Sequence, residues 1–219
     1  MLMLRTQFED ELDKLHNQFY AMGTEVSSQI SKTVRAFISH DRQLAKEVIE
    51  SDEIVNNYET KLEKKSLEII ALQQPVSTDL RSVVTVLKAS SDVERMGDHA
   101  SAIAKATIRM KGEERIKEVE DHINRMGRAV RIMVEEAMNV YIKADEAAAY
   151  AVAAHDEHID NLFVETQNMT VEAIKANPDA AFAAKEYFQV LMYLERIGDY
   201  ARNICEWVVY LKTGKIIEL

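Results

Sequence analysis

Residues 93–100 read VERMGDHA, and residues 194–201 read LERIGDYA. When the chain is shifted by 101 residues, five of these eight positions are identical: Glu, Arg, Gly, Asp and Ala. With a slightly larger shift, DEIVNN at 52–57 resembles DEHIDN at 156–161, and the two prolines of the chain also correspond. Self-similarity at a fixed spacing is typical of a duplicated structural unit. The sequence therefore predicts two copies of one unit of about a hundred residues.

Each unit is expected to contain three helices. In the first of them, apolar residues from Phe8 to Phe37 recur at steps of three and four, the spacing of one face of an α-helix. Pro75 ends a second apolar stripe, and Ser77 or Thr78 is a candidate N-cap for the helix that follows. The six predicted helices cover about 8–39, 44–69, 78–109, 123–142, 146–176 and 182–212.

Composition favours an all-α fold. Only two prolines and six glycines occur in 219 residues, and strong helix formers dominate the chain. Because the connections between the predicted helices are short, neighbouring helices must run antiparallel, as in helical bundles. The predicted architecture is two tandem three-helix bundles related by an internal repeat. We expect the first bundle at residues 1–111 and the second at residues 112–219.

Charge and hydropathy narrow the class of protein. A net charge of −10 argues against nucleic-acid binding, because a broad basic surface would leave an even more acidic remainder. No apolar run is long enough for the core of a signal peptide or for a membrane span, so a soluble, cytoplasmic protein is expected. Cys205 is the only cysteine, which excludes an internal disulfide and favours a packing role.

The repeated motif places two acidic residues four positions apart on one helical face. Glu94 and Asp98 lie about 40° apart on a helical wheel. Glu195 and Asp199 have the same separation. Leu87 lies within about 20° of both Glu94 and Asp98, so these carboxylates are expected to continue the core-facing stripe. Acidic groups in such a position need protonation, a basic partner or a metal cation, because an unpaired buried charge is costly.

Further acidic residues on the preceding helices are expected to converge on the same regions. They are Asp52 and Glu59 in the first unit, and Asp156 and Asp160 in the second. Clusters of carboxylate oxygens suit Mg, Mn, Ca or iron better than an ion that prefers thiolates. The pattern therefore predicts a metal site in each unit. Sequence motifs for di-iron oxidases, phosphate loops and nucleophile elbows are absent.

Arg95 and Arg196 supply a competing interpretation. Each follows its glutamate directly and lies about 100° away on the wheel, so it is expected to point elsewhere on its own helix and to pair with the other half or with a partner. A purely structural network of ion pairs is therefore an alternative to a metal site. Gly97 and Gly198 lower helix propensity in both copies, which indicates close approach between helices.

The segments PVSTDLRSVVTVLKASSDVERMGDHA (75–100) and FQVLMYLERIGDYARNICEWVVYLKTGK (188–215) resemble the paired signature segments of the PhoU family. This resemblance implies two tandem three-helix bundles and a protein that represses phosphate uptake and the phosphate-starvation response. It also implies a homodimer that contacts the ATPase subunit of the phosphate ABC transporter and a membrane sensor histidine kinase. Association with membrane complexes would then be peripheral.

The same resemblance implies that the acidic motifs bind divalent or ferric metal ions, with iron, zinc, manganese and magnesium as candidates. The implied ligands are Glu94, Asp98, Glu195, Asp199, Asp52, Asp156 and Asp160. Asn56 stands where the second half has Asp160, and Ala102 stands where it has Asn203, so the two sites need not be equivalent. A non-enzymatic regulator is the first hypothesis. A carboxylate-bundle metalloenzyme and a metal-free helical scaffold protein are the alternatives.

Overall fold

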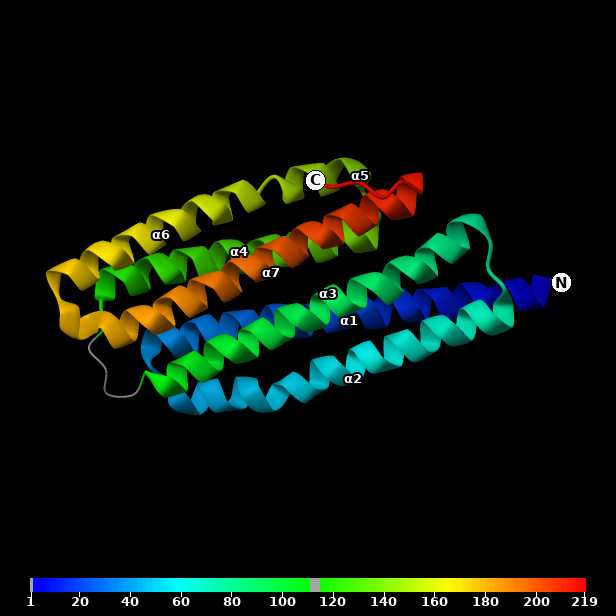
Figure 1. The fold of residues 1–219 in the computed structure, drawn as a ribbon. Coiled ribbons are helices and arrows are strands. Elements are labelled where there is room, and N and C mark those ends of the chain that lie inside the picture. Colours follow the sequence, from blue (N-terminus) through cyan, green and yellow to red (C-terminus); the bar gives the residue numbers. More distant parts are fainter. Residues whose placement is uncertain (1, 111–114) are drawn as a thin grey trace.

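The computed structural model describes residues 2–110 and 115–219, and this part of the chain contains helices and their connections but no strand (Figure 1). The elements are α1 (Leu2–Ser39), α2 (Arg42–Gln73), α3 (Ser77–Arg109), α4 (Lys117–Lys143), α5 (Glu146–Ala153), α6 (Asp156–Ala176), a 3-10 helix at Pro178–Ala180, and α7 (Ala181–Thr213). The predicted all-α class is confirmed.

The two halves of the chain form two bundles that lie side by side along their length. In the first half α1, α2 and α3 pack against one another, and in the second half α4 to α7 do so. The halves meet where α3 packs against α7 and where α1 packs against α4, behind them in Figure 1. We call these two contacts the seam. The tandem bundles predicted from the repeat are confirmed, whereas their predicted boundary, between residues 111 and 112, lies outside the described residues.

Helix starts follow local backbone chemistry. Asp41 caps α2, because its carboxylate accepts hydrogen bonds from two backbone N–H groups of the first turn, at 3.0 Å each. The prediction that Ser77 or Thr78 caps α3 is wrong. Val76, which follows the proline, takes the extended backbone of an N-cap and makes no side-chain bond, and Ser77 already lies inside the helix with φ of 50°.

The single helix predicted over residues 146–176 is instead divided into α5 and α6. Ala154 and His155 keep right-handed backbone angles. However, the N–H of His155 donates to the carbonyl of Val152, three residues back, at 3.0 Å. This tighter turn interrupts the α-helical ladder without glycine or proline. No breaker residue therefore marks the division in the sequence.

The buried apolar residues of both halves join in one continuous core. The apolar stripe predicted on the first helix is fully buried between residues 15 and 30, at Leu15, Phe19, Met22, Val26 and Ile30. Cys205 also lies in this core, where burial raises the pKa of its thiol to about 12. Among the described residues, no helix combines the length and apolar character that a membrane span requires.

Glycines allow α1 and α4 to approach closely at the seam. A Cβ atom added at Gly127 of α4 would lie 2.6 Å from Val34 of α1. One added at Gly23 of α1 would lie 2.5 Å from Met138 of α4. Both distances are shorter than real Cβ contacts, so a neighbour must shift; the flexible end of Met138 can do so, whereas the branched Val34 has less freedom, which makes Gly127 the tighter position.

Polar bonds join α3 to α7 on the other side of the seam. The Nη2 group of Arg109 donates to Glu186 Oε2 at 2.6 Å, and Glu186 is fully buried. The indole Nε1 of Trp207 donates to Asp92 Oδ2 at 3.0 Å. Because both acceptors are buried carboxylates, the loss of either donor would remove a hydrogen bond where water cannot readily replace it.

Candidate metal centres

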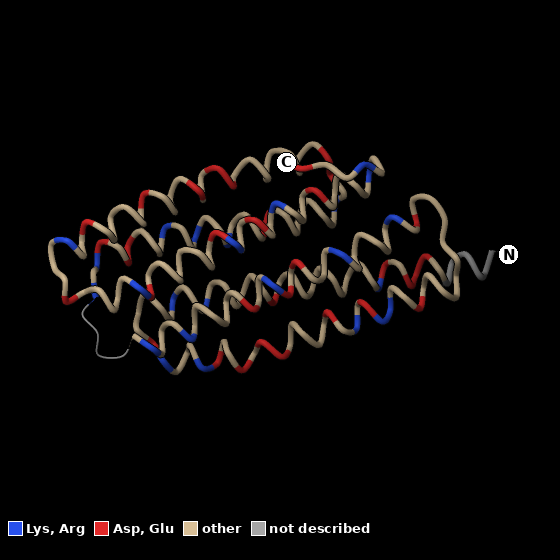
Figure 2. Tube along the Cα trace, viewed as in Figure 1, with Lys and Arg blue, Asp and Glu red and all other residues tan. Residues whose placement is uncertain are grey.

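The first acidic cluster lies between α2 and α3. We define it as Asp52 and Glu59 of α2 with Glu94 and Asp98 of α3. The pKa of Glu94 is raised to about 7, first by burial and then by the nearby carboxylates of Asp98, Glu59 and Asp52. The structure thus brings together the three ligands predicted for this half. Figure 2 shows many acidic positions along α2 and along α6, the corresponding helix of the second half.

Asp52 carries an unsatisfied buried acceptor. Its Oδ1 atom is buried and has no hydrogen-bond partner among the described residues. Burial, followed by the charge of Asp98, raises the pKa of Asp52, and Lys105 lowers it. Four further oxygen atoms in the described residues of this half are also buried without a partner: Gln29 Oε1, Ser66 Oγ, Thr85 Oγ1 and Ser101 Oγ. A buried oxygen without a partner needs a donor or a cation, so the Oδ1 atom of Asp52 is a candidate ligand for a hard metal ion.

The second acidic cluster lies between α6 and α7. It consists of Asp156 and Asp160 of α6 with Glu195 and Asp199 of α7. Burial raises the pKa of Asp156, which is only 5% exposed. Burial, followed by the charge of Asp199, also raises the pKa of Glu195, to which Asp160 and Asp156 contribute further. All four ligands predicted for this half are therefore neighbours.

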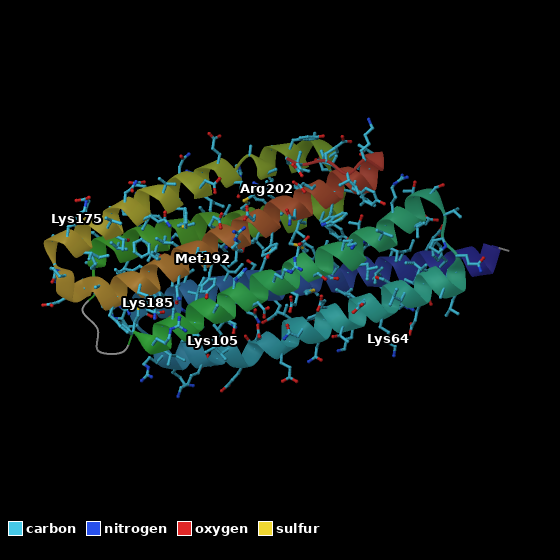
Figure 3. The ribbon with its side chains drawn as sticks, in the orientation of Figure 1. Lys64, Lys105, Lys175, Lys185, Met192 and Arg202 are labelled. Carbon is cyan, nitrogen blue, oxygen red and sulfur yellow. The ribbon has the colours of Figure 1, made fainter. Side chains whose placement is uncertain are left out.

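Two arginines of α7 form ion pairs with carboxylates of the second cluster. Arg202, labelled in Figure 3, donates to the carboxylate of Asp156 on α6 and, at 3.3 Å, to Asp199. The Nη1 group of Arg196 donates to Asp199 Oδ2 at 3.0 Å, and its Nε atom lies 3.6 Å from Glu195 Oε2. The expectation that Arg196 points away from its own motif is wrong, because residues three apart on a helix are neighbours. The alternative of an ion-pair network describes this cluster well.

The predicted inward orientation holds for only part of the ligand set. Asp156 is buried, and Glu94 and Glu195 are partly buried, but Asp98 and Asp160 are exposed. Each exposed aspartate follows a more buried acid by four residues. The rotation of about 40° between such positions moves the second side chain to the margin of the buried face.

In the arrangement described, no three His, Cys, Asp or Glu side chains are placed so that they could hold one metal ion. Glu59, for example, accepts a hydrogen bond from Ser91 Oγ at 2.8 Å. A cation at the first cluster therefore requires side chains to change rotamer. The exposed position of Asp98 leaves it room to do so.

The other residues of the repeated motif serve packing. A Cβ atom added at Gly97 would lie 3.3 Å from a side chain of α2, and one added at Gly198 would lie 3.2 Å from Asp156 Oδ1. The close helix approach predicted at both glycines is confirmed. Arg95 reaches the other half of the molecule, where its guanidinium lies 5.8 Å from the ring centroid of Tyr200.

Arg202 was not among the predicted site residues. The shift of 101 that aligns the two motifs places it opposite Ser101, one position beyond the last identical residue. The stretch compared up to Ala102 and Asn203 already contains an arginine beside one motif and a serine beside the other. That difference is the signal in the sequence for unequal clusters.

Known proteins match this chain in sequence and in fold. The family model described as the PhoU domain matches residues 19–107 and 123–208. The chain belongs to the PhoU family. Each matched PhoU domain contains one of the two acidic clusters. The resemblance read from the paired motifs is therefore confirmed.

Individual PhoU relatives match over nearly the whole chain. A PhoU homologue from Clostridium acetobutylicum, described as a phosphate-specific transport system accessory protein, is 34% identical over 99% of both chains. The crystal structure of the phosphate transport system regulatory protein PhoU from Streptococcus pneumoniae has a TM-score of 0.89 at 30% identity, covering 97% of this chain and 100% of that one. The crystal structure of PhoU from Pseudomonas aeruginosa has a TM-score of 0.88 at 34% identity, and the match covers 95% of this chain and 100% of that one.

Proposed function

We propose that this protein is an accessory regulator of phosphate transport that represses phosphate uptake and the phosphate-starvation response. The match to PhoU homologues over 99% of the chain carries this proposal, because those homologues are described as phosphate-specific transport system accessory proteins. In this proposal the protein acts in the cytoplasm as a non-enzymatic homodimer. Its partners are the ATPase subunit of the phosphate ABC transporter and a membrane sensor histidine kinase.

The proposal includes a metal at the first acidic cluster, with Asp52, Glu94 and Asp98 as ligands. A divalent or ferric ion there, such as iron, zinc, manganese or magnesium, would compensate the negative charge of these carboxylates. It would also fix α2 against α3 and so shape a surface for the partner proteins. At the second cluster the arginines already supply positive charge, so we expect weaker metal binding there.

Deletion of the gene tests the regulatory function. In medium rich in phosphate, the deletion strain is expected to take up more phosphate and to produce more alkaline phosphatase than the parent strain, because the repressor is missing. A plasmid copy of the gene should restore both readings. If uptake and phosphatase output are the same in the deletion strain and in the parent, the proposed function is wrong.

A further inference from the structure

A groove runs along the contact between α1 and α4 at the seam. Its larger part has a volume of 620 Å³, and an adjoining part of 600 Å³ shares Ser31, Arg35 and Arg131 with it. Because α1 belongs to the first half of the chain and α4 to the second, both halves form this groove. The acidic clusters lie elsewhere, on α2 and α3 and on α6 and α7.

Four basic side chains line the groove. Lys32 and Arg35 lie one turn apart on α1, and Arg128 and Arg131 lie one turn apart on α4. Among the described residues that line it, Glu135 is the one acid. Glu135 is already engaged, since its Oε1 atom lies 2.6 Å from Nη1 of Arg131.

Three of these four cations have no acidic partner. Within residues 2–110 and 115–219, the side chains of Lys32, Arg35 and Arg128 make neither a salt bridge nor a hydrogen bond, whereas Arg131 makes both. The whole chain has 37 acidic and 27 basic residues, so acidic partners are plentiful elsewhere. A concentration of unpaired positive charge in a concave site of an acidic protein raises the local concentration of anions.

The groove also offers hydroxyl donors beside the cations. Ser28 and Ser31 line it, and their hydroxyl groups make no hydrogen bond with any described residue. The hydroxyl of Ser27 donates to Glu135 Oε1 at 2.9 Å, which holds that carboxylate near Arg131. Guanidinium and hydroxyl groups both donate hydrogen bonds, and phosphate oxygens accept hydrogen bonds from both.

We propose that this groove binds a small molecule that carries two or more linked phosphate groups. Basic pairs on two helices can contact separate phosphates, and arginine binds phosphate oxygens through two parallel N–H groups. A volume of 620 Å³ lies within the range of about 300–1,000 Å³ typical of small-molecule sites. Since both halves supply cations, the ligand holds the two bundles together at the seam. This inference does not depend on the regulatory function proposed above.

Isothermal titration calorimetry on the full-length protein tests the site, at low ionic strength and with a chelator present so that no metal bridges the ligand. The probes are inorganic phosphate, pyrophosphate and ATP. Pyrophosphate and ATP are expected to bind saturably and more tightly than inorganic phosphate. The double variant Arg35→Gln with Arg128→Gln is expected to bind them about tenfold more weakly or worse, since two charge-assisted contacts are lost. A difference in affinity between pyrophosphate and ATP shows whether the site prefers an inorganic ligand or a nucleotide.

Lys46→Gln is the matched control, because it removes an exposed cation of α2 outside the groove. It should bind the probes as the wild-type protein does. Circular dichroism checks that each variant is folded, and if the double variant is not, each single variant must weaken binding by itself. The proposal is overturned if the wild type shows no saturable binding, or if the groove variants bind as tightly as Lys46→Gln. Equal affinity for phosphate and pyrophosphate overturns the requirement for two phosphates.

Discussion

Arg202 and Ser101 occupy corresponding positions of the repeat, yet they give the two acidic clusters different electrostatics. Arg202 donates to a buried aspartate and to a second carboxylate of its motif. Ser101 carries no charge, and its own hydroxyl oxygen is buried without a partner in the described chain. The first cluster therefore lacks the arginine hydrogen bonds of the second, and Lys105 acts on Asp52 only through its charge.

Replacing this arginine should open the second cluster to metal. In Arg202→Ser, the buried Asp156 loses its donor, so a cation becomes the remaining source of positive charge. Without metal, we expect the free energy of unfolding to fall by about 1–3 kcal/mol, the cost of an unsatisfied buried acceptor. After chelation and reloading with manganese or zinc, the metal content measured by mass spectrometry should exceed that of the wild type. Lys212→Ser, which removes an exposed cation of α7, is the control, and equal metal content in both variants would contradict the prediction.

The titration of Glu94 predicts how stability depends on pH. In the folded protein its pKa is raised from 4.5 to about 7. Between these values the folded state keeps a proton that the unfolded state has released, so Glu94 makes the protein less stable as the pH rises from about 5 to about 8. In the presence of a chelator, Glu94→Gln should therefore melt at a higher temperature than the wild type at the upper pH. The two proteins should differ less at the lower pH.

Glu63→Gln provides the comparison for this experiment, because Glu63 is an exposed glutamate on the same helix as Asp52. Its melting temperature should follow that of the wild type at every pH. If the melting temperature of Glu94→Gln also follows that of the wild type across the whole pH range, burial among carboxylates does not raise the pKa of Glu94.

Sequence alone predicted which carboxylates gather but not how each group is neutralised. The doubled motif placed Glu94, Asp98, Glu195 and Asp199 correctly on their helices, because helical spacing fixes which residues share a face. The contact between Arg202 and Asp156 depends on how α7 packs against α6. Such a contact between helices leaves no trace in the spacing of residues along one helix.

Among the helices, the long apolar stripes were easily predicted and the short irregularities were not. The first helix, predicted to stop near residues 39–41, ends at Ser39, and the third ends at Arg109 as predicted. The division between α5 and α6 escaped prediction, because the backbone stays right-handed through it and no residue there is a helix breaker. The N-cap of α3 was also predicted wrongly, because a serine near a helix start is only a statistical signal for capping.

The close contact of α1 with α4 makes Gly127 a sensitive position. In Gly127→Ala the added Cβ would lie 2.6 Å from Val34, so the helices must separate. We expect a loss of about 1–3 kcal/mol from overpacking, partly offset by about 1 kcal/mol of better helix propensity. Urea denaturation followed by circular dichroism measures the difference. Gly97→Ala, where the nearest contact is 3.3 Å, should cost less, and the reverse order would contradict this account.

At the scale of the whole molecule, the two bundles share one core and should unfold together. The buried apolar cluster crosses the seam, and Trp207 of the second half is bonded to Asp92 of the first. Trp207 is the only tryptophan of the chain, so its fluorescence reports on the seam. In urea, this fluorescence and the helical circular dichroism signal should change with the same midpoint. Two separate transitions would show that the halves are independent.

Cys205, enclosed in the core, makes the folded protein unusually convenient for site-specific labelling. Its pKa of about 12 keeps the group as an unreactive thiol, since only the thiolate attacks reagents such as maleimides. Cysteines introduced on the outer surfaces of α2 and α6 would therefore accept fluorescent dyes while the native residue stays in place. Energy transfer between such dyes would report the distance between the outer surfaces of the two bundles in real time.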